Sequence, residues 1–307
     1  MKHRYFSRTI ASNIVALTML LAQTGMGQET KAALLVNTDW LSAHLKDRNL
    51  VLLHVGSRQE PGAKTEYDAG HIPGARFISL EDVALPMNPG SPGLMLELPP
   101  ADELRAKLSS LGISEDSQIV IYTGNAGAFQ SATRIVFTLD YIGLGDRTSV
   151  LNGGVTAWTG AGHMLTAETP KVTPGKLTAK PTKNIVADAQ LVQSIAQHPN
   201  QKLVDARAAV FYKGIEPSFQ MNGHIPGAIN IPFSQIVDNT MKVDRERVAV
   251  LFRDAGIKPG DTVVAYCHVG QQATAVIFAA RLLGNPIMLY DGSFQDWAMN
   301  KRGAVEK

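Results

Sequence analysis

The chain has 307 residues, of which 45% are hydrophobic and 18% are charged, and its formal net charge is +2. This composition is that of a globular protein, and the length suffices for two domains of about 100–150 residues. The near-neutral charge disfavours a nucleic-acid-binding protein. The eight histidines lie singly along the chain, without the spacing of a zinc site. We therefore expect neither nucleic acid nor a metal as a partner.

The first 27 residues have the pattern of a secretory signal peptide. Three basic residues lie within the first eight, an apolar run covers residues 10–22, and small residues lead up to Gly27. That order is typical of an exported precursor. A membrane anchor, the alternative, needs about 20 apolar residues, and this run is shorter and contains polar residues. We expect export with cleavage near Gly27, into the periplasm of a Gram-negative source, without stable insertion in the membrane.

The rest of the chain contains two copies of one unit. The motif GHIPGA occurs at residues 70–75 and again at 223–228, each time between two apolar runs. Residues 107–122 match residues 250–266 in the same order. Each copy alternates strand, turn and helix, which predicts an α/β fold with a mostly parallel sheet flanked by helices.

A proline-rich segment separates the two copies. Pro170 and Pro174 lie in a stretch with few large apolar residues, which is typical of a linker. We place the linker at residues 165–176 and the two domains at residues 31–164 and 177–307.

The two copies differ where a reactive group is expected. Thr123 occupies the position of Cys267, the only cysteine in the chain, and His54 occupies that of Asp205. The loop after Thr123 is also longer. We predict that the first domain is inactive and that it covers the cleft of the second.

Cys267 lies in the six-residue loop CHVGQQ. The apolar run 261–266 before it predicts a buried strand, and residues 273–284 predict a helix that ends at a glycine. Ligands of open α/β sheets bind at such strand-to-helix loops. The alternative is that Cys267 is an inert, small buried residue.

The helix N-terminus predicts a reactive thiol. Its unpaired N–H groups stabilise an anion, and cysteines so placed have pKa values lowered from about 8.5 to about 3.5–7.5. Gly270 allows the backbone to curl around the sulfur with a positive φ. We therefore expect Cys267 to be a thiolate near neutral pH.

Together these motifs resemble the two-domain rhodanese family of sulfurtransferases, which has an inactive N-terminal and an active C-terminal domain. The resemblance rests on both GHIPGA segments, on DAR at residues 205–207, on CHVGQQ and on DGSFQDW at residues 291–297. It implies that both domains are rhodanese-like and that Cys267 is the nucleophile. The family's phosphatase relatives have a loop one residue longer and use an arginine to bind phosphate, so the six-residue loop disfavours a phosphatase.

The resemblance also implies a mechanism. The Cys267 thiolate would attack the outer sulfur of thiosulfate, release sulfite and hold the sulfur as a persulfide until a thiophilic acceptor such as cyanide or a thiol removes it. Backbone N–H groups at the helix N-terminus would stabilise the persulfide, so that a monomer needs neither a metal nor an organic cofactor. The residues expected to form this binding loop are His268, Val269, Gly270, Gln271, Gln272 and Ala273.

The sequence also gives expectations for five further residues. Asp205 would accept backbone N–H groups of the loop with Arg207 as its partner; a structural ion pair at the strand end is the alternative. His224 is expected to be structural, because the inactive copy has a histidine at the same place in GHIPGA. Arg281, like Lys213, is expected on a solvated face.

The choice of sulfur donor depends on departures from the family. Thiosulfate enzymes of the family tend to have basic residues where this chain has His268, Val269 and Phe211, so we expect weaker anion binding. The mercaptopyruvate enzymes typically have a serine at the position of Val269. The missing hydroxyl favours thiosulfate, with His268 adding a hydrogen-bond donor or, when protonated near its ordinary pKa of about 6.5, a positive charge. A 3-mercaptopyruvate sulfurtransferase and a non-catalytic sulfur carrier or binding module remain the alternatives.

Overall fold

The computed structural model describes residues 1, 32–56, 63–86, 93–124, 128–178 and 180–307. Apart from its first residue, the predicted signal peptide lies outside these ranges. Residues 31–307 form one compact unit. Among the described residues, no helix combines the length and apolar character that crossing a membrane requires.

The unit contains two five-stranded sheets, and every strand pair in both sheets is parallel. The strand orders are β1-β5-β4-β2-β3 and β6-β10-β9-β7-β8, so the sheets correspond strand for strand. The first sheet consists of β1 (Leu35–Val36), β2 (Leu50–Gly56), β3 (Arg76–Ser79), β4 (Gln118–Thr123) and β5 (Thr148–Leu151). The second consists of β6 (Val186–Ala187), β7 (Gln201–Asp205), β8 (Ile229–Asn230), β9 (Thr262–Tyr266) and β10 (Ile287–Tyr290).

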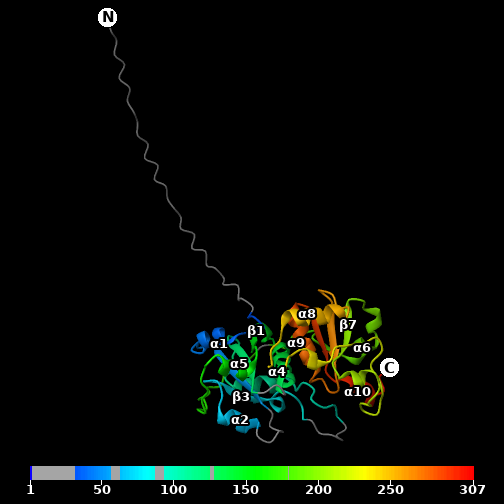
Figure 1. Cartoon of the computed structure of the whole chain (residues 1–307), viewed down its shortest axis with the longest axis horizontal. Helices are drawn as coiled ribbons and strands as arrows, with labels where there is room; N and C mark the ends of the chain where they lie inside the picture. Colours follow the sequence, from blue (N-terminus) through cyan, green and yellow to red (C-terminus); the bar gives the residue numbers. More distant parts are fainter. Residues whose placement is uncertain (2–31, 57–62, 87–92, 125–127, 179) are drawn as a thin grey trace. The chain divides into compact units, whose positions relative to one another are not determined.

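Helices flank both sheets (Figure 1), which confirms the predicted α/β fold. Those of the first half are α1 (Thr38–His44), α2 (Ala63–Ala69), α3 (Ala101–Ser110), α4 (Phe129–Tyr141) and α5 (Gly154–Gly160). Those of the second half are α6 (Ala189–Gln193), α7 (Ala209–Tyr212), α8 (Arg245–Asp254), α9 (Ala273–Leu283) and α10 (Ser293–Met299). The described part of the chain also contains the short 3-10 turns η1 (Leu80–Asp82), η3 (Gly145–Arg147), η4 (Ile195–Gln197) and η5 (Phe233–Gln235).

Helices α4 and α9 pack against each other between the two halves (Figure 1). Most residues of each helix are buried, because one side covers its own sheet and another side packs on the other helix. The rings of Phe129 and Phe278 meet edge to face at 6.0 Å, and both halves contribute to one hydrophobic core. This packing explains why the sequence of α9 shows no polar face.

The two GHIPGA turns are held in the same way. The backbone N–H of Ile72 donates to the hydroxyl of Tyr122, and that of Ile225 donates to the hydroxyl of Tyr266, each at 3.0 Å. His224 lies with its Nδ1 2.8 Å from the carbonyl of Tyr212 and its ring stacked on the tyrosine. His71 makes the equivalent contacts with Tyr67, so the geometry of His224 is that of a structural residue.

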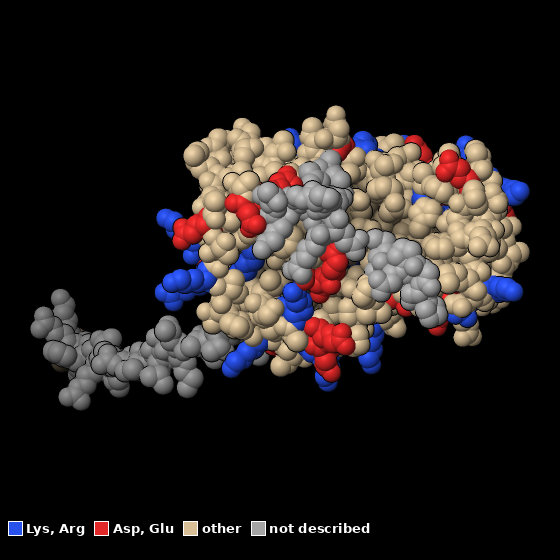
Figure 2. All heavy atoms as spheres, turned by 90° about the horizontal axis from the view of Figure 1, so that it is seen from below, with Lys and Arg blue, Asp and Glu red and all other residues tan. Residues whose placement is uncertain are grey.

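The surface charge is mixed. On the described part of the face shown in Figure 2, basic and acidic side chains lie interspersed among uncharged ones. This distribution fits the formal net charge of +2.

Candidate active site

Cys267 directly follows β9, and the loop Cys267–Gln272 leads into α9, as predicted. The thiol is fully buried. Gly270 has φ +81°, and a Cβ there would lie 2.5 Å from the carbonyl oxygen of Asp291. Only glycine fits this position, both for its conformation and for the close approach of the backbone.

The start of α10 holds the peptide groups on both sides of Cys267. The Cys267 N–H donates to Ser293 Oγ at 3.1 Å, and the Cys267 carbonyl accepts the N–H of Phe294 at 3.0 Å. The His268 carbonyl accepts the N–H of Gln295, also at 3.0 Å. These contacts fix the direction of the loop as it leaves the strand.

Ser293 has φ +53°, a left-handed conformation that is costly for a residue other than glycine. Its hydroxyl also donates to the carbonyl of Tyr290 at 2.9 Å. In the first half the matching residue is Gly154, which has the same φ of +53°. Ser293 was not among the residues predicted from the sequence. The alignment of NGG (152–154) with DGS (291–293) could have pointed to it, because serine there replaces a glycine that suits the left-handed backbone.

Full burial raises the pKa of the Cys267 thiol above its ordinary value, because the charged form loses its hydration. The backbone N–H groups of Ala273, Val269, Gly270 and Gln272 act in the opposite direction but do not outweigh it. The predicted low pKa is therefore wrong for this closed arrangement. The expected ring of N–H donors is present for these four residues.

His268 is neutral at pH 7, which corrects the expected positive charge. Burial lowers its pKa to about 4, and the nearby guanidinium of Arg207 acts in the same direction. Its Nδ1 lies 2.8 Å from Ser218 Oγ, and its ring meets the edge of Phe211 at 4.6 Å. Phe211 stands where thiosulfate enzymes of the family tend to have a basic residue. With the neutral His268 it forms an uncharged surface beside the loop.

Asp205 and Arg207 form a fully buried ion pair below the loop. The Arg207 Nη2 lies 2.6 Å from Asp205 Oδ2, which also accepts the hydroxyl of Tyr266 at 2.8 Å. The backbone N–H that Asp205 accepts is that of Arg207, at 2.9 Å. The expectation that Asp205 binds N–H groups of the cysteine loop is therefore wrong, because its oxygens are occupied by Arg207 and Tyr266. Through this hydrogen bond the ion pair holds Tyr266, the residue directly before Cys267.

The first half covers the cysteine loop. The N–H of Met95 donates to Gln295 Oε1 at 2.8 Å, and that of Leu98 donates to Asp291 Oδ2 at 2.7 Å. Val269 packs against the apolar cluster that contains Leu96. The Gln271 side-chain amide donates to a residue of α4, Ser131 Oγ, at 3.0 Å. The prediction that the first domain covers the cleft of the second is therefore confirmed.

Thr123 lies at the end of β4, at the place equivalent to the cysteine. Its hydroxyl donates to the sulfur of Met241 in the second half at 2.8 Å, and the side chain is buried. The residues 125–127 that follow lie outside the described residues. The space beside Thr123 is thus filled by a side chain of the other domain.

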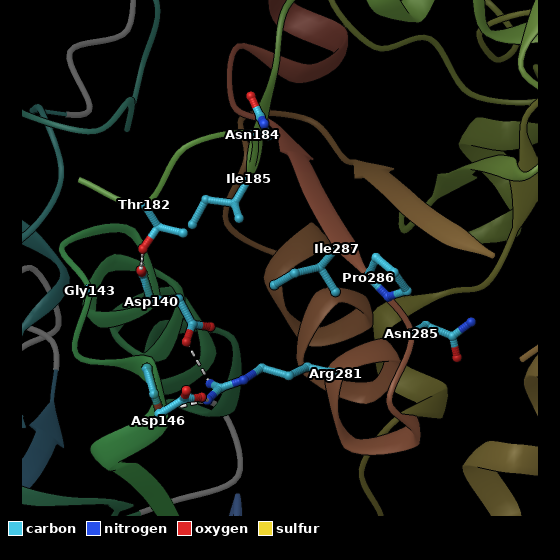
Figure 3. A pocket seen from close by; sticks show the side chains of 11 residues that line it. Asp140, Gly143, Asp146, Thr182, Asn184, Ile185, Arg281, Asn285, Pro286 and Ile287 are labelled. Carbon is cyan, nitrogen blue, oxygen red and sulfur yellow. Dashed lines mark hydrogen bonds and ion pairs between the residues drawn. The ribbon is translucent and has the colours of Figure 1, made fainter. Parts of the chain in front are cut away.

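Arg281 does not lie on a solvated face. Its Nη1 is 2.7 Å from Asp140 Oδ1 on α4, and its Nη2 donates to the carbonyl of Gly145 at 2.6 Å. Figure 3 shows this contact at the edge of a pocket of about 410 Å³ between the two halves. Arg281 therefore joins the domains, whereas Lys213 is exposed as expected.

No group of three or more histidine, cysteine, aspartate or glutamate side chains is placed to hold a metal ion in the described part of the chain.

Comparison with known proteins agrees with this geometry. Residues 37–161 and 188–300 each match the rhodanese-like domain. A probable 3-mercaptopyruvate sulfurtransferase of Pseudomonas aeruginosa is 35% identical over 288 residues, which are 89% of this chain and 98% of the relative. The thiosulfate sulfurtransferase of Cricetulus griseus is 32% identical over 277 residues, which are 86% of this chain and 91% of the relative.

A solved structure shows the same arrangement. The crystal structure of a 3-mercaptopyruvate sulfotransferase from Escherichia coli has a TM-score of 0.74 and 25% identity, over 85% of this chain and 99% of that one. The chain therefore belongs to the rhodanese family, as a tandem sulfurtransferase in which the domain is repeated.

Proposed function

We propose that this protein transfers sulfur through a persulfide on Cys267. The observation that carries the proposal is the position of the only cysteine, at the amino end of α9 with four backbone N–H groups directed at its sulfur. Such donors stabilise negative charge on the terminal sulfur of a persulfide without a metal. The inactive domain supports the proposal, because it has a threonine at the matching position and a filled space beside it.

In the proposed first half-reaction, the Cys267 thiolate attacks the outer sulfur of the donor. A new S–S bond forms on Cys267, the donor's own bond to that sulfur breaks, and its electron pair leaves with the remainder of the donor. In the second half-reaction a thiophilic acceptor attacks the terminal sulfur and the cysteine leaves as a thiolate. The cycle returns the enzyme unchanged and is ping-pong.

Thiosulfate is the donor that we propose. Its remainder is sulfite, a stable anion that needs no proton to leave, and the loop has Val269 rather than a hydroxyl residue two positions after the cysteine. His268 is neutral, so the contribution of its charge no longer supports this choice. The name of the Pseudomonas aeruginosa relative keeps 3-mercaptopyruvate as the alternative donor.

The test is mass spectrometry of the purified protein after incubation with thiosulfate or with 3-mercaptopyruvate, paired with turnover to cyanide. The proposal expects one added sulfur on Cys267 and a higher kcat/KM with thiosulfate. A persulfide that forms without turnover would favour the sulfur carrier. Faster turnover with mercaptopyruvate would reverse the choice of donor.

We also propose export of the mature chain. The pattern of residues 1–27 supports it. Fractionation of the source cells, with N-terminal sequencing of the mature protein, tests both the compartment and cleavage near Gly27.

A further inference from the structure

Arg134 reaches the cysteine loop from the inactive domain. It lies on α4 and its side chain is fully buried. Nη1 donates to the Gly270 carbonyl at 3.0 Å and to Asp291 Oδ1 at 2.6 Å, and Nη2 donates to the Leu96 carbonyl at 2.6 Å. One guanidinium thus connects the loop, the end of β10 and the covering segment.

The duplication provides an internal comparison for this contact. The residue of α9 that matches Arg134 is Ala275, and the residue that matches Asp291 is Asn152. Asn152 holds the opposite domain through neutral hydrogen bonds, accepting the Val243 N–H at 2.8 Å and donating to its carbonyl at 3.1 Å. The ion pair therefore occurs on the side that has the cysteine and not at its counterpart.

Adhesion between the domains does not require such a pair. Burying an arginine and an aspartate carries a large desolvation penalty, and apolar residues of similar volume often stabilise a contact equally well. The neutral contacts of Asn152 show that the contact at the matching position of the other copy is made without charge. The Arg134–Asp291 pair is thus explained better by the neighbouring cysteine loop than by the need to hold the two domains together.

The Gly270 carbonyl belongs to the one glycine of the cysteine loop, which has φ +81°. Glycine with a positive φ has few restraints on its own backbone, and the N–H of Gly270 is among those directed at the sulfur. A guanidinium on the carbonyl holds this turn in one orientation and places a positive charge beside it.

We propose that Arg134 is a positioning residue of the sulfur-transfer site, supplied by the inactive domain, which keeps the backbone donors of the loop directed at Cys267. The inference rests on the proposed role of Cys267. It gives the inactive domain a specific part in the chemistry beyond covering the cleft.

Arg134→Met removes the contact, and Arg134→Lys retains a charge without the planar fork. Arg281→Met is the matched control, since Arg281 is also a nearly buried arginine between the domains, bound to Asp140 and Gly145 near the opposite end of α9 (Figure 3). The double variant Arg134→Met with Asp291→Asn avoids an unpaired carboxylate and matches the neutral counterpart. The double variant replaces the single variant in the experiment if the single variant does not fold.

Two measurements distinguish a role of Arg134 in positioning the loop from a role only in holding the two domains together. Thiolate absorbance and the alkylation rate, followed against pH, report the thiol pKa, and the single cysteine makes both unambiguous. We expect Arg134→Met to raise the thiol pKa by about one unit. At pH values below that pKa the thiolate fraction, and with it the rate of persulfide formation, should fall roughly tenfold. Arg134→Lys should give values in between. Arg281→Met should lower Tm and leave both readouts at the wild-type values.

An unchanged thiol titration and persulfide rate in folded Arg134→Met, or in the double variant, would overturn the inference. The thiol titration requires no sulfur donor. A wild-type protein that forms no persulfide would therefore contradict the proposed function, while the titration would still test Arg134.

Discussion

The hydroxyl of Thr133 lies 2.9 Å from the hydroxyl of Thr274, and the two are equivalent residues of the duplicated helices α4 and α9. Both side chains are buried. The Thr133 hydroxyl also lies 3.1 Å from the Gln130 carbonyl, and the Thr274 hydroxyl lies 2.6 Å from the Gln271 carbonyl. Each hydroxyl has a single proton, so these contacts share two protons with the contact between the threonines. The two halves thus meet through the same residue of each copy, and one side of this contact belongs to the cysteine loop.

This pair makes the two threonines unequal in function. Thr133→Val and Thr274→Val should each lower the free energy of unfolding by about 1–3 kcal/mol, because each leaves the other buried hydroxyl without this partner. Thr274→Val should also slow persulfide formation, since it frees the carbonyl of Gln271. Urea unfolding and single-turnover rates check this, and equal rates in the two variants would contradict the link to the loop.

Gly270→Ala should be more destabilising than the strain of its φ alone. Gly260 is the control, because it has φ +87° and a Cβ added there would have nothing within 4 Å, whereas at Gly270 a Cβ would meet the Asp291 carbonyl at 2.5 Å. We expect Gly260→Ala to cost about 1–2 kcal/mol and to spare activity. Gly270→Ala should cost more and abolish most sulfur transfer. Similar losses of stability in the two variants would show that the loop can move away from Asp291.

Ser293→Gly and Ser293→Ala separate strain from function. Both remove the hydroxyl that accepts the Cys267 N–H, and a lost bond of about 1 kcal/mol corresponds to a several-fold lower rate. The glycine variant also relieves the left-handed φ, so it should be more stable than the alanine variant. Thermal unfolding and persulfide rates measure the two effects. Wild-type rates in both variants would remove Ser293 from the site.

The pH dependence of persulfide formation should follow the thiol. Because burial raises the pKa of Cys267, the thiolate fraction and the rate should increase with pH across the neutral range. The neutral His268 should add no change near its ordinary pKa. Single-turnover rates over this range test the expectation, and a rate that is already constant at and below neutral pH would contradict it.

Acid should destabilise the fold through two histidines. Burial lowers the pKa of His268 and that of His54 to about 4 each, so the unfolded chain binds protons more tightly. Their contribution to stability is present above about pH 6.5 and is lost as the pH falls towards 4. Replacing either histidine with glutamine should flatten the fall in Tm over this window. An unchanged slope would contradict the assignment.

The sequence was sufficient for those features that depend on local pattern. The strand before Cys267, the loop, the helix from Ala273 and the turn at Gly270 all follow from apolar runs and glycines that lie close together in the chain. The duplication identified the sheets, because GHIPGA recurs with the same neighbours. Each of these sequence patterns reflects the local structure of the residues that form it.

The features that the sequence missed depend on how the two domains pack. Arg134 and Arg281 lie on helices whose partners come from the other half of the chain, so neither local charge nor periodicity reveals their contacts. The thiol pKa was predicted with the wrong sign because the helix N-terminus can be read from the sequence, whereas the full burial of Cys267 in the hydrophobic core cannot. The burial that keeps His268 neutral likewise depends on tertiary packing.

The central claim is that Cys267 accepts the sulfur, and the most direct test is the mass of the intact protein after brief incubation with thiosulfate and removal of the excess. The account predicts one added sulfur atom in the wild type, located on Cys267 by peptide mapping and lost on addition of cyanide. The folded Cys267→Ser variant should gain no sulfur and show no turnover. Sulfur transfer by Cys267→Ser, or an unmodified wild-type Cys267 during active turnover, would contradict it.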